Sequence, residues 1–387
     1  MKALAHFCAD ADALSGIEKL RRFGKNKIPG INDAEIGFWG GELDPFPKEN
    51  VVFVDTSPNG LKADPQKGIF VFNHHPHSMY PGQTACSMID KEFGLTDEKN
   101  AELTEWAATN DFFLTGDPLV ITRVIIEMHS DYSDDEVYKW FASHIDAHFN
   151  APELSAENLG EGLKLFEEMI EKFIDDKECL PGTEAILSDW LRRAEITICN
   201  KMALPHRIAV HLAYFGKEET ENWFLVVLRS VEEGQRIFLQ AEEDFKKAEK
   251  IIAGDKVIVI AESGNLKFHN FARGKRAREM LGIKTEPIVL VFKPNNSGFQ
   301  IFPNKSGFRL EQTAIDLRME ILGQRGNLIP LGWQTVKEGT LEGTEPLYFH
   351  NTGMQMLMWG WRTAPNVRPM DITQETVKRI VCDNARS

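Results

Sequence analysis

The side chains best suited to chemistry are acidic and imidazole groups that follow short apolar runs. The candidate ligands are His6, Asp10, Asp12, Asp55, His74 and Asp111. Carboxylates gathered in one place repel one another and lose solvation unless a cation lies among them. Six oxygen and imidazole ligands suit two octahedral divalent cations such as Mn²⁺ or Mg²⁺. The combination predicts a two-metal site, although each segment alone is more typical of a turn, a helix cap or a buried histidine.

Short apolar runs must position these side chains. They lie at residues 2–8, 35–39, 50–55 and 68–73, and a helical pattern begins near residue 13. Runs of this kind alternating with helices predict βαβ units and a mostly parallel sheet flanked by helices, which is an α/β fold. In such sheets the chemistry gathers where strands end and helices begin. The candidate ligands are therefore expected to converge at one edge.

The rest of the chain predicts a helical cap and a second domain. Leu163, Phe166, Ile170 and Phe173 form an apolar stripe on a helix with an acidic back. A charged pattern then predicts a connecting helix, after which strand-like runs return. The predicted domains are a catalytic domain with its helical cap at 1–228, a connecting helix at 229–253, and a smaller α/β C-terminal domain, which binds substrate, at 254–387.

Length and composition bound the class of protein. The chain has 387 residues, more than one ordinary core needs, so two domains are expected. Its five cysteines are scattered and lack Cys-x-x-Cys spacing, which favours reduced thiols over disulfides or a zinc ribbon. An apolar leader and a run long enough to cross a membrane are both missing from the sequence. We expect a soluble, cytoplasmic protein without a membrane partner.

Charge is unevenly distributed along the chain. The formal net charge is −14, which argues against a duplex nucleic-acid partner. Residues 131–195 hold most of the acidic excess, whereas residues 264–284 carry six basic side chains against one acidic. This basic arm, with Arg273, Lys275 and Arg276, is a candidate contact for a short anionic substrate. An ordinary solvated face is at least as good an interpretation.

The motifs HFCADAD, VVFVD, NHHP and ND, in this order, resemble the signature of the DHH phosphoesterase superfamily. That superfamily includes RecJ-type exonucleases, oligoribonucleases and family II inorganic pyrophosphatases. The resemblance covers about residues 1–115 and includes PGQTACSMIDKEFGL at 81–95. Two features depart from it. Asn73 stands where relatives have the aspartate of Asp-His-His. The Gly-Gly-Gly-His run of many relatives is missing from the sequence.

The resemblance implies a role for each candidate ligand. One cation would be held by His6, Asp10 and Asp111, and the other by Asp12 and His74. Asp55 would bridge the two, and His75 would face the substrate phosphate. The implied cofactor is Mn²⁺, two ions per site, with Mg²⁺ or Co²⁺ as alternatives. Paired cations lower the pKa of a shared water and neutralise charge on a phosphoryl group.

The C-terminal part carries a shorter resemblance. LYFHNTG at 347–353 is similar to the tail of Myg-type exonucleases of the same superfamily, which makes His350 and Asn351 candidate substrate contacts; a strand-end turn explains them as well. His206 and His211 lie five residues apart, off the spacing that puts two ligands on one helix face, so we interpret them as structural.

The sequence thus predicts a metal-dependent phosphoesterase. The leading substrate is a short single-stranded oligonucleotide or dinucleotide, cleaved in an exonuclease-like reaction. Hydrolysis of a small phosphorylated molecule or of inorganic pyrophosphate is the alternative within enzymes. The alternative from another class is a non-catalytic ligand-binding protein in which Asn73 has weakened the metal site.

Overall fold

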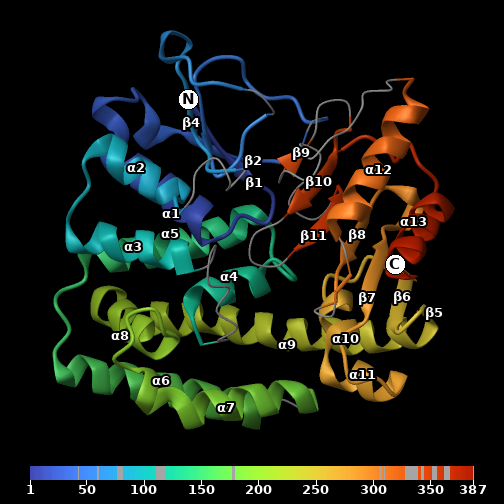
Figure 1. Cartoon of the computed structure of the whole chain (residues 1–387). Coiled ribbons are helices and arrows are strands. Elements are labelled where there is room, and N and C mark those ends of the chain that lie inside the picture. Colours follow the sequence, from blue (N-terminus) through green and yellow to red (C-terminus); the bar gives the residue numbers. More distant parts are fainter. Residues whose placement is uncertain are drawn as a thin grey trace. The chain divides into compact units, whose positions relative to one another are not determined.

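A computed structural model describes residues 1–41, 43–58, 61–75, 82–109, 119–176, 179–304, 307–308, 310–326, 339–340, 344–350, 355–360 and 367–386. The chain folds as two units. The first comprises residues 1–39, 46–74 and 82–236, and the second comprises residues 40–45, 75–81 and 237–387. Each unit has a sheet of its own, so the predicted α/β class with a second α/β part is confirmed (Figure 1).

The first unit is built on a four-stranded parallel sheet. Its strand order is β2-β1-β3-β4, and every pairing is parallel. The strands are β1 (Lys2–His6), β2 (Glu35–Trp39), β3 (Val51–Val54) and β4 (Ile69–Phe72). They coincide with the apolar runs of the sequence. Parallel pairing places all four carboxyl ends at one edge, as the proposed convergence of ligands requires.

Both faces of this sheet are covered. Val52 and Val54 belong to the large core of the unit, whereas Val51 and Phe53 belong to a smaller cluster on the other face, as the two-residue period of a strand requires. Helix α1 (Ala11–Phe23) lies against the sheet so closely that a Cβ on Gly16 would meet Val54 Cγ1 at 2.6 Å. Glycine at this position therefore sets the distance between α1 and β3.

Helices make up most of the remaining first unit. They are α2 (Ala85–Phe93), α3 (Glu98–Ala108), α4 (Ile121–Met128), α5 (Asp134–Asn150), α6 (Ala156–Asp175), α7 (Pro181–Thr197) and α8 (Leu204–Phe215). The predicted stripe lies on α6, where Phe166, Ile170 and Phe173 are buried and Leu163 packs against the same core. The helical pattern read from the sequence is confirmed here.

Helix α9 (Lys217–Lys247) differs from the predicted connecting helix at both ends. It begins a dozen residues before position 229, because apolar residues such as Phe224, Val227 and Leu228 continue its buried face into the first core. It also ends before position 253, since Glu249–Ala253 forms strand β5, which pairs with β6 (Lys256–Glu262). The division between the two units falls within this helix, after Arg236.

The second unit contains a mixed sheet in the order β5-β6-β7-β8-β11-β10-β9. Only β6 and β7 pair in parallel among its described strands; the other pairings are antiparallel. The further strands are β7 (Ile288–Phe292), β8 (Phe299–Phe302), β9 (Gly339–Thr340), β10 (Leu347–His350) and β11 (Met356–Trp359). Its helices are α10 (Phe268–Arg273), α11 (Lys275–Leu281), α12 (Leu310–Gln324) and α13 (Gln374–Arg386).

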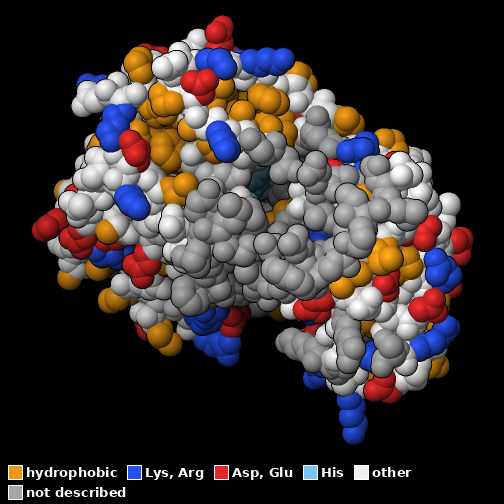
Figure 2. Space-filling model, turned by 45° about the horizontal axis from the view of Figure 1, so that its top comes forward, with side chains coloured by type: hydrophobic (Ala, Val, Ile, Leu, Met, Phe, Trp, Pro, Cys, Tyr) orange, Lys and Arg blue, Asp and Glu red, His pale blue; other side chains and the backbone are white. Residues whose placement is uncertain are grey.

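This second sheet is also covered on both faces. Leu290 joins the core formed with α12 and α13, whereas its neighbours Val289 and Val291 join the core formed with α10 and the end of α9. In the view of Figure 2, acidic and basic side chains are intermingled among the coloured residues rather than gathered into one basic patch. Among the described residues, we find no helix long and apolar enough to cross a membrane.

Candidate metal centre

Five of the predicted ligands meet at the carboxyl edge of the parallel sheet. The group, which we call the strand-end cluster, consists of His6, Asp10, Asp12, Asp55 and His74. His6 is the last residue of β1, Asp55 directly follows β3, and His74 lies two residues beyond β4. All five belong to the first unit. The strand ends bring together residues that lie up to 68 positions apart in the chain.

Asp55 contacts both histidines of the cluster. One carboxylate oxygen, Oδ1, lies 2.8 Å from His74 Nε2, and the other, Oδ2, lies 3.3 Å from His6 Nε2. Asp55 is 3% exposed, and its backbone has a φ of 55°, a left-handed conformation that is uncommon outside glycine. Its amide still continues the sheet by donating to the Phe72 carbonyl at 2.8 Å. Such backbone strain is characteristic of functional sites.

The ring of His6 is oriented by its neighbour along the chain. Its Nδ1 lies 2.8 Å from the carbonyl oxygen of Phe7, which can only accept a hydrogen bond, so Nδ1 carries the proton. In the neutral ring the lone pair of Nε2 then faces Asp55. Ligand atoms of His6, Asp10 and Asp55 all lie within 4.8 Å of one another. A second ring nitrogen held by a carbonyl is typical of metal-binding histidines.

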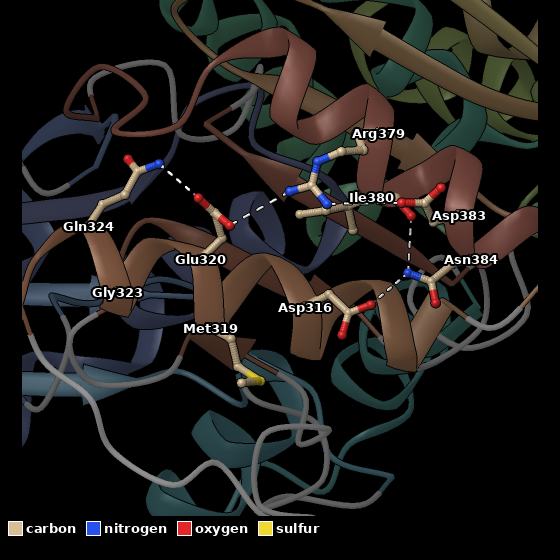
Figure 3. Close-up of a pocket in the computed structure, with 9 residues that line it drawn as sticks. All are labelled: Asp316, Met319, Glu320, Gly323, Gln324, Arg379, Ile380, Asp383 and Asn384. Carbon is tan, nitrogen blue, oxygen red and sulfur yellow. Dashed lines mark hydrogen bonds and ion pairs between the residues drawn. The ribbon is translucent and has the colours of Figure 1, made fainter.

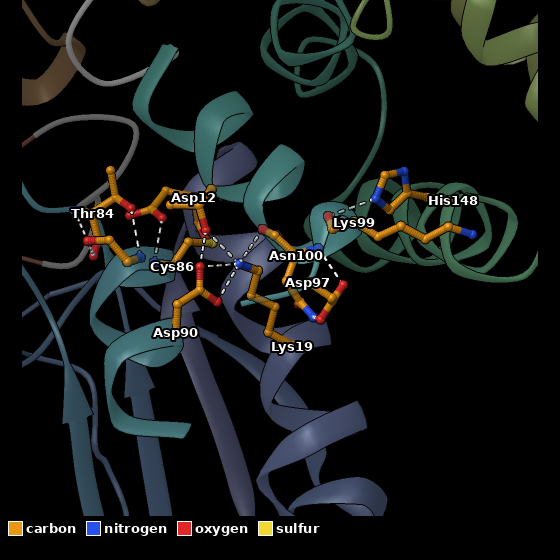
Figure 4. Close-up of polar contacts among 11 residues, drawn as sticks. Asp12, Lys19, Thr84, Cys86, Asp90, Asp97, Lys99, Asn100 and His148 are labelled. Carbon is orange, nitrogen blue, oxygen red and sulfur yellow. Dashed lines mark hydrogen bonds and ion pairs between the residues drawn. The ribbon is translucent and has the colours of Figure 1, made fainter. Parts of the chain in front are cut away.

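Two helix N-termini hold the remaining carboxylates. Asp10 is the N-cap of α1, and its Oδ1 accepts from the amides of Asp12 (2.9 Å) and Ala13 (3.2 Å). Asp12 accepts from the first amides of α2, Ala85 at 2.6 Å and Cys86 at 2.8 Å (Figure 4). His74 Nε2 lies 3.4 Å from Oδ2 of Asp12. Unsatisfied amides at helix N-termini stabilise negative charge, which allows two carboxylates to be buried here.

The pKa values show that the cluster has more negative charge than its own histidines balance. Burial opposes protonation of His6, but the hydrogen bond and charge of Asp55 outweigh it and raise the pKa of His6 to about 9. Burial and the charge of Asp55 raise the pKa of Asp12 to about 7, and the same causes raise the pKa of Asp10. Burial also lowers the pKa of His74, but the hydrogen bond and charge of Asp55 outweigh it, so the pKa of His74 is raised. The cluster therefore favours cations, whether protons or metal ions.

Asn73 and His75 flank His74. Asn73 Nδ2 donates to Ser57 Oγ at 2.9 Å, and this hydrogen bond ties the end of β4 to the segment after β3. His75 is half-buried and begins a segment that belongs to the second unit. Its predicted role at the substrate phosphate stays a prediction. Asp111 and Asn351 lie outside the described residues.

The other predicted substrate contacts belong to the second unit. Arg273 donates to Glu286 at 2.7 Å, and Arg276 donates to Glu242 at 2.6 Å. Lys275 has 85% of its side chain exposed and lies 3.8 Å from Glu279. His350 is the last residue of β10 and is half-buried. The basic arm thus has acidic neighbours, and its contact with a substrate stays a prediction.

A separate pocket of about 570 Å³ lies between α12 and α13 of the second unit (Figure 3). Its polar side chains pair with one another: Arg379 with Glu320 at 3.8 Å, and Asn384 with Asp316 at 2.8 Å. The residues that line it include none of the predicted substrate contacts. We therefore assign no function to this pocket.

Lys19 is a part of the site's support that sequence reasoning missed. It is fully buried, and its ammonium donates to Asp90 at 2.6 and 2.8 Å, to Thr104 Oγ1 at 2.6 Å and to the Asn100 carbonyl at 2.9 Å (Figure 4). These bonds tie α1, whose first turn includes Asp12, to α2 and α3. A lysine in a predicted helix is ordinarily expected to be exposed to solvent, so the sequence did not indicate that Lys19 would link these helices.

The comparisons with known proteins leave the family open. No protein-family model and no curated protein matches the chain. Among solved structures, the chain is similar to a pGpG-specific phosphodiesterase, PggH of Vibrio cholerae, with a TM-score of 0.37 and 11% identity over 99% of each chain. At this TM-score and identity the likeness carries no conclusion about this protein.

Proposed function

We propose that this protein is a divalent-metal-dependent phosphoesterase that hydrolyses phosphodiester bonds of short oligonucleotides or dinucleotides. The observation that carries the proposal is the convergence of five buried or half-buried ligands at the carboxyl edge of the parallel sheet. The order of the motifs that supply them, which resembles the DHH signature, also supports it.

The residues of the cluster fit two divalent cations. Asp55 offers one oxygen toward His6 and the other toward His74, which is the arrangement that a bridging carboxylate needs. Two imidazoles and three carboxylates are ligands that Mn²⁺ accepts. Such a pair of cations, when bound, would lower the pKa of a water and stabilise charge on a phosphoryl group. Asp10 and Asp12, fixed by the helix amides, would keep the donor set rigid during the reaction.

The experiment compares substrates in one assay. Purified protein with Mn²⁺ would be incubated with a 5′-phosphorylated RNA dinucleotide, a short single-stranded DNA, a duplex and inorganic pyrophosphate. We expect hydrolysis of the dinucleotide and of the single strand, little of the duplex, and loss of activity when a chelator removes the metal.

Asp55→Asn should abolish hydrolysis because the amide loses the charge that two cations would share. Asp64→Asn is the matched control, since Asp64 lies in the same unit but pairs with the neighbouring Lys67 at the surface. Equal activity of the wild type and Asp55→Asn would refute the catalytic proposal. Activity on pyrophosphate alone would favour the alternative of a small-molecule phosphatase or pyrophosphatase.

A further inference from the structure

A second group of ligands lies in the first unit, outside the strand-end cluster. Cys8, His129 and Asp134 each offer one ligand atom, and these atoms lie within 4.8 Å of one another. Cys8 lies in the loop between β1 and α1, His129 directly follows α4, and Asp134 is the first residue of α5. More than 120 positions separate Cys8 from the other two. Sequence spacing therefore gave no sign of this group.

The surroundings of His129 resemble those of a metal ligand. Its Nε2 lies 2.8 Å from the Ala9 carbonyl oxygen, which can only accept, so Nε2 carries a proton. Its Nδ1 faces Oδ1 of Asp134 at 3.2 Å. Two acceptors at this distance repel each other in the neutral ring, and either a second proton or a metal ion between them removes the repulsion.

Burial and backbone geometry favour a built site. The side chain of His129 is 3% exposed and that of Asp134 is 11% exposed. Cys8 is half-buried and has a φ of 52°, one of few described non-glycine residues in the left-handed region. The peptide chain thus holds the thiol beside the imidazole and the carboxylate at the cost of an unfavourable conformation.

We propose that Cys8, His129 and Asp134 bind a zinc ion, distinct from the cations of the strand-end cluster. Sulfur, imidazole nitrogen and carboxylate oxygen are the three kinds of protein ligand that zinc takes, and the soft sulfur selects zinc over Mn²⁺ or Mg²⁺. The ion would bind Cys8 as a thiolate and displace its proton to solvent. Bound in this way, zinc would tie the loop between His6 and Asp10 to the end of α4 and the start of α5.

The test uses the full chain, freed of metal by a chelator and loaded with Co²⁺ as a spectroscopic substitute for zinc. A cobalt ion bound to a thiolate absorbs in the near ultraviolet through charge transfer from sulfur, whereas the strand-end cluster has no sulfur ligand. We expect this band to appear on loading with cobalt, to disappear on addition of zinc, and to be lost in Cys8→Ser.

Two control variants locate the sulfur. Cys86→Ser removes the thiol beside Asp12, whose Sγ lies 3.5 Å from the Asp12 carbonyl oxygen, and Cys179→Ser removes another half-buried thiol of the first unit. Both should keep the band. Its survival in Cys8→Ser, or its loss in Cys86→Ser alone, would overturn the assignment.

A measurement on the wild type covers the case in which Cys8→Ser does not fold. Zinc-edge X-ray absorption should show a sulfur neighbour at about 2.3 Å besides nitrogen and oxygen neighbours at about 2.0–2.2 Å. A zinc spectrum without sulfur, or no zinc bound, would mean that His129 and Asp134 form only an ion pair, and the proposal would be wrong. Neither readout depends on hydrolytic activity.

Discussion

Two buried groups of histidines in the first unit have opposite electrostatics. In the strand-end cluster, the carboxylate of Asp55 raises the pKa of both His6 and His74 against the effect of burial. The second group, which we call the tryptophan–histidine cluster, lies on α3, α5, α8 and α9. It consists of Trp106, His144, His148, Arg207, His211 and Trp223.

Burial in the tryptophan–histidine cluster acts in the other direction. It lowers the pKa of His148 to about 3 and that of His211 to about 4, and the nearby charge of Arg207 adds to both shifts. Burial and Arg207 also lower the pKa of His144, which stacks with Trp106 and Trp223 at 5.9 and 5.5 Å. A buried histidine is therefore no sign of a metal site by itself. The sign of the neighbouring charge decides whether the group attracts cations.

The largest expected effect comes from removing the negative charge of Asp55, which gives the strand-end cluster its electrostatic difference from the tryptophan–histidine cluster. In metal-free Asp55→Asn, burial should dominate at His6 as it does at His144, so the pKa of His6 should fall from about 9 to below its ordinary 6.5. NMR titration of the imidazole nitrogens measures this change. A His6 that stays protonated at pH 8 in the variant would show that Asp55 is not the cause.

The tryptophan–histidine cluster should make the protein less stable in acid. The folded state keeps His144 neutral, so below about pH 6.5 the unfolded chain binds one more proton than the folded protein. The free energy of unfolding therefore decreases as the pH is lowered. At pH 5 this amounts to roughly 2 kcal/mol for one histidine. His144→Phe keeps the stacking and removes the proton site.

Urea unfolding of metal-free protein at pH 7.5 and pH 5 tests this. Between pH 7.5 and pH 5, the free energy of unfolding should fall by about 2 kcal/mol less in the variant than in the wild type. The exposed Lys164 offers a control, since Lys164→Gln should leave the difference between the two pH values unchanged. An unchanged difference for His144→Phe would contradict the pKa assignment.

Manganese affinity should depend on pH at the strand-end cluster. A raised folded-state pKa means that the metal-free protein holds a proton on His6 up to about pH 9, and Mn²⁺ must displace it to bind Nε2. The apparent affinity should rise at least tenfold from pH 7 to pH 8, because protons on other ligands of the cluster, such as Asp12, must leave as well. Calorimetry in two buffers of different ionisation enthalpy counts the released protons. Binding without proton release would be at odds with this description.

The smallest effect is expected in the basic arm. Lys275 is exposed and near Glu279, so Lys275→Glu should raise the KM for an oligonucleotide only a few-fold, and only at low salt. Hydrolysis of a chromogenic phosphodiester that has no other phosphate group should stay the same, because such a substrate lacks the additional negative charges that the basic arm would contact. Identical KM values for Lys275→Glu and the wild type at low salt would favour the interpretation of the arm as a solvated face.

The sequence predicted the strand-end cluster because its parts are local. Each ligand closely follows an apolar run, and parallel strands bring their carboxyl ends together wherever they lie in the chain. The amides that hold Asp12, the buried Lys19 and the group around Cys8 could not be predicted in this way. They depend on how α1, α2 and the segments beside α4 and α5 pack together. The spacing of residues within a short stretch of sequence does not predict such packing.

The proposed function requires two divalent cations in the strand-end cluster. The most direct measurement is anomalous diffraction from crystals soaked in manganese. Two peaks about 3.5–4 Å apart, flanked by His6 and His74 with Asp55 between them, are the predicted result. No peak there at saturating manganese, or a single one, would contradict the account.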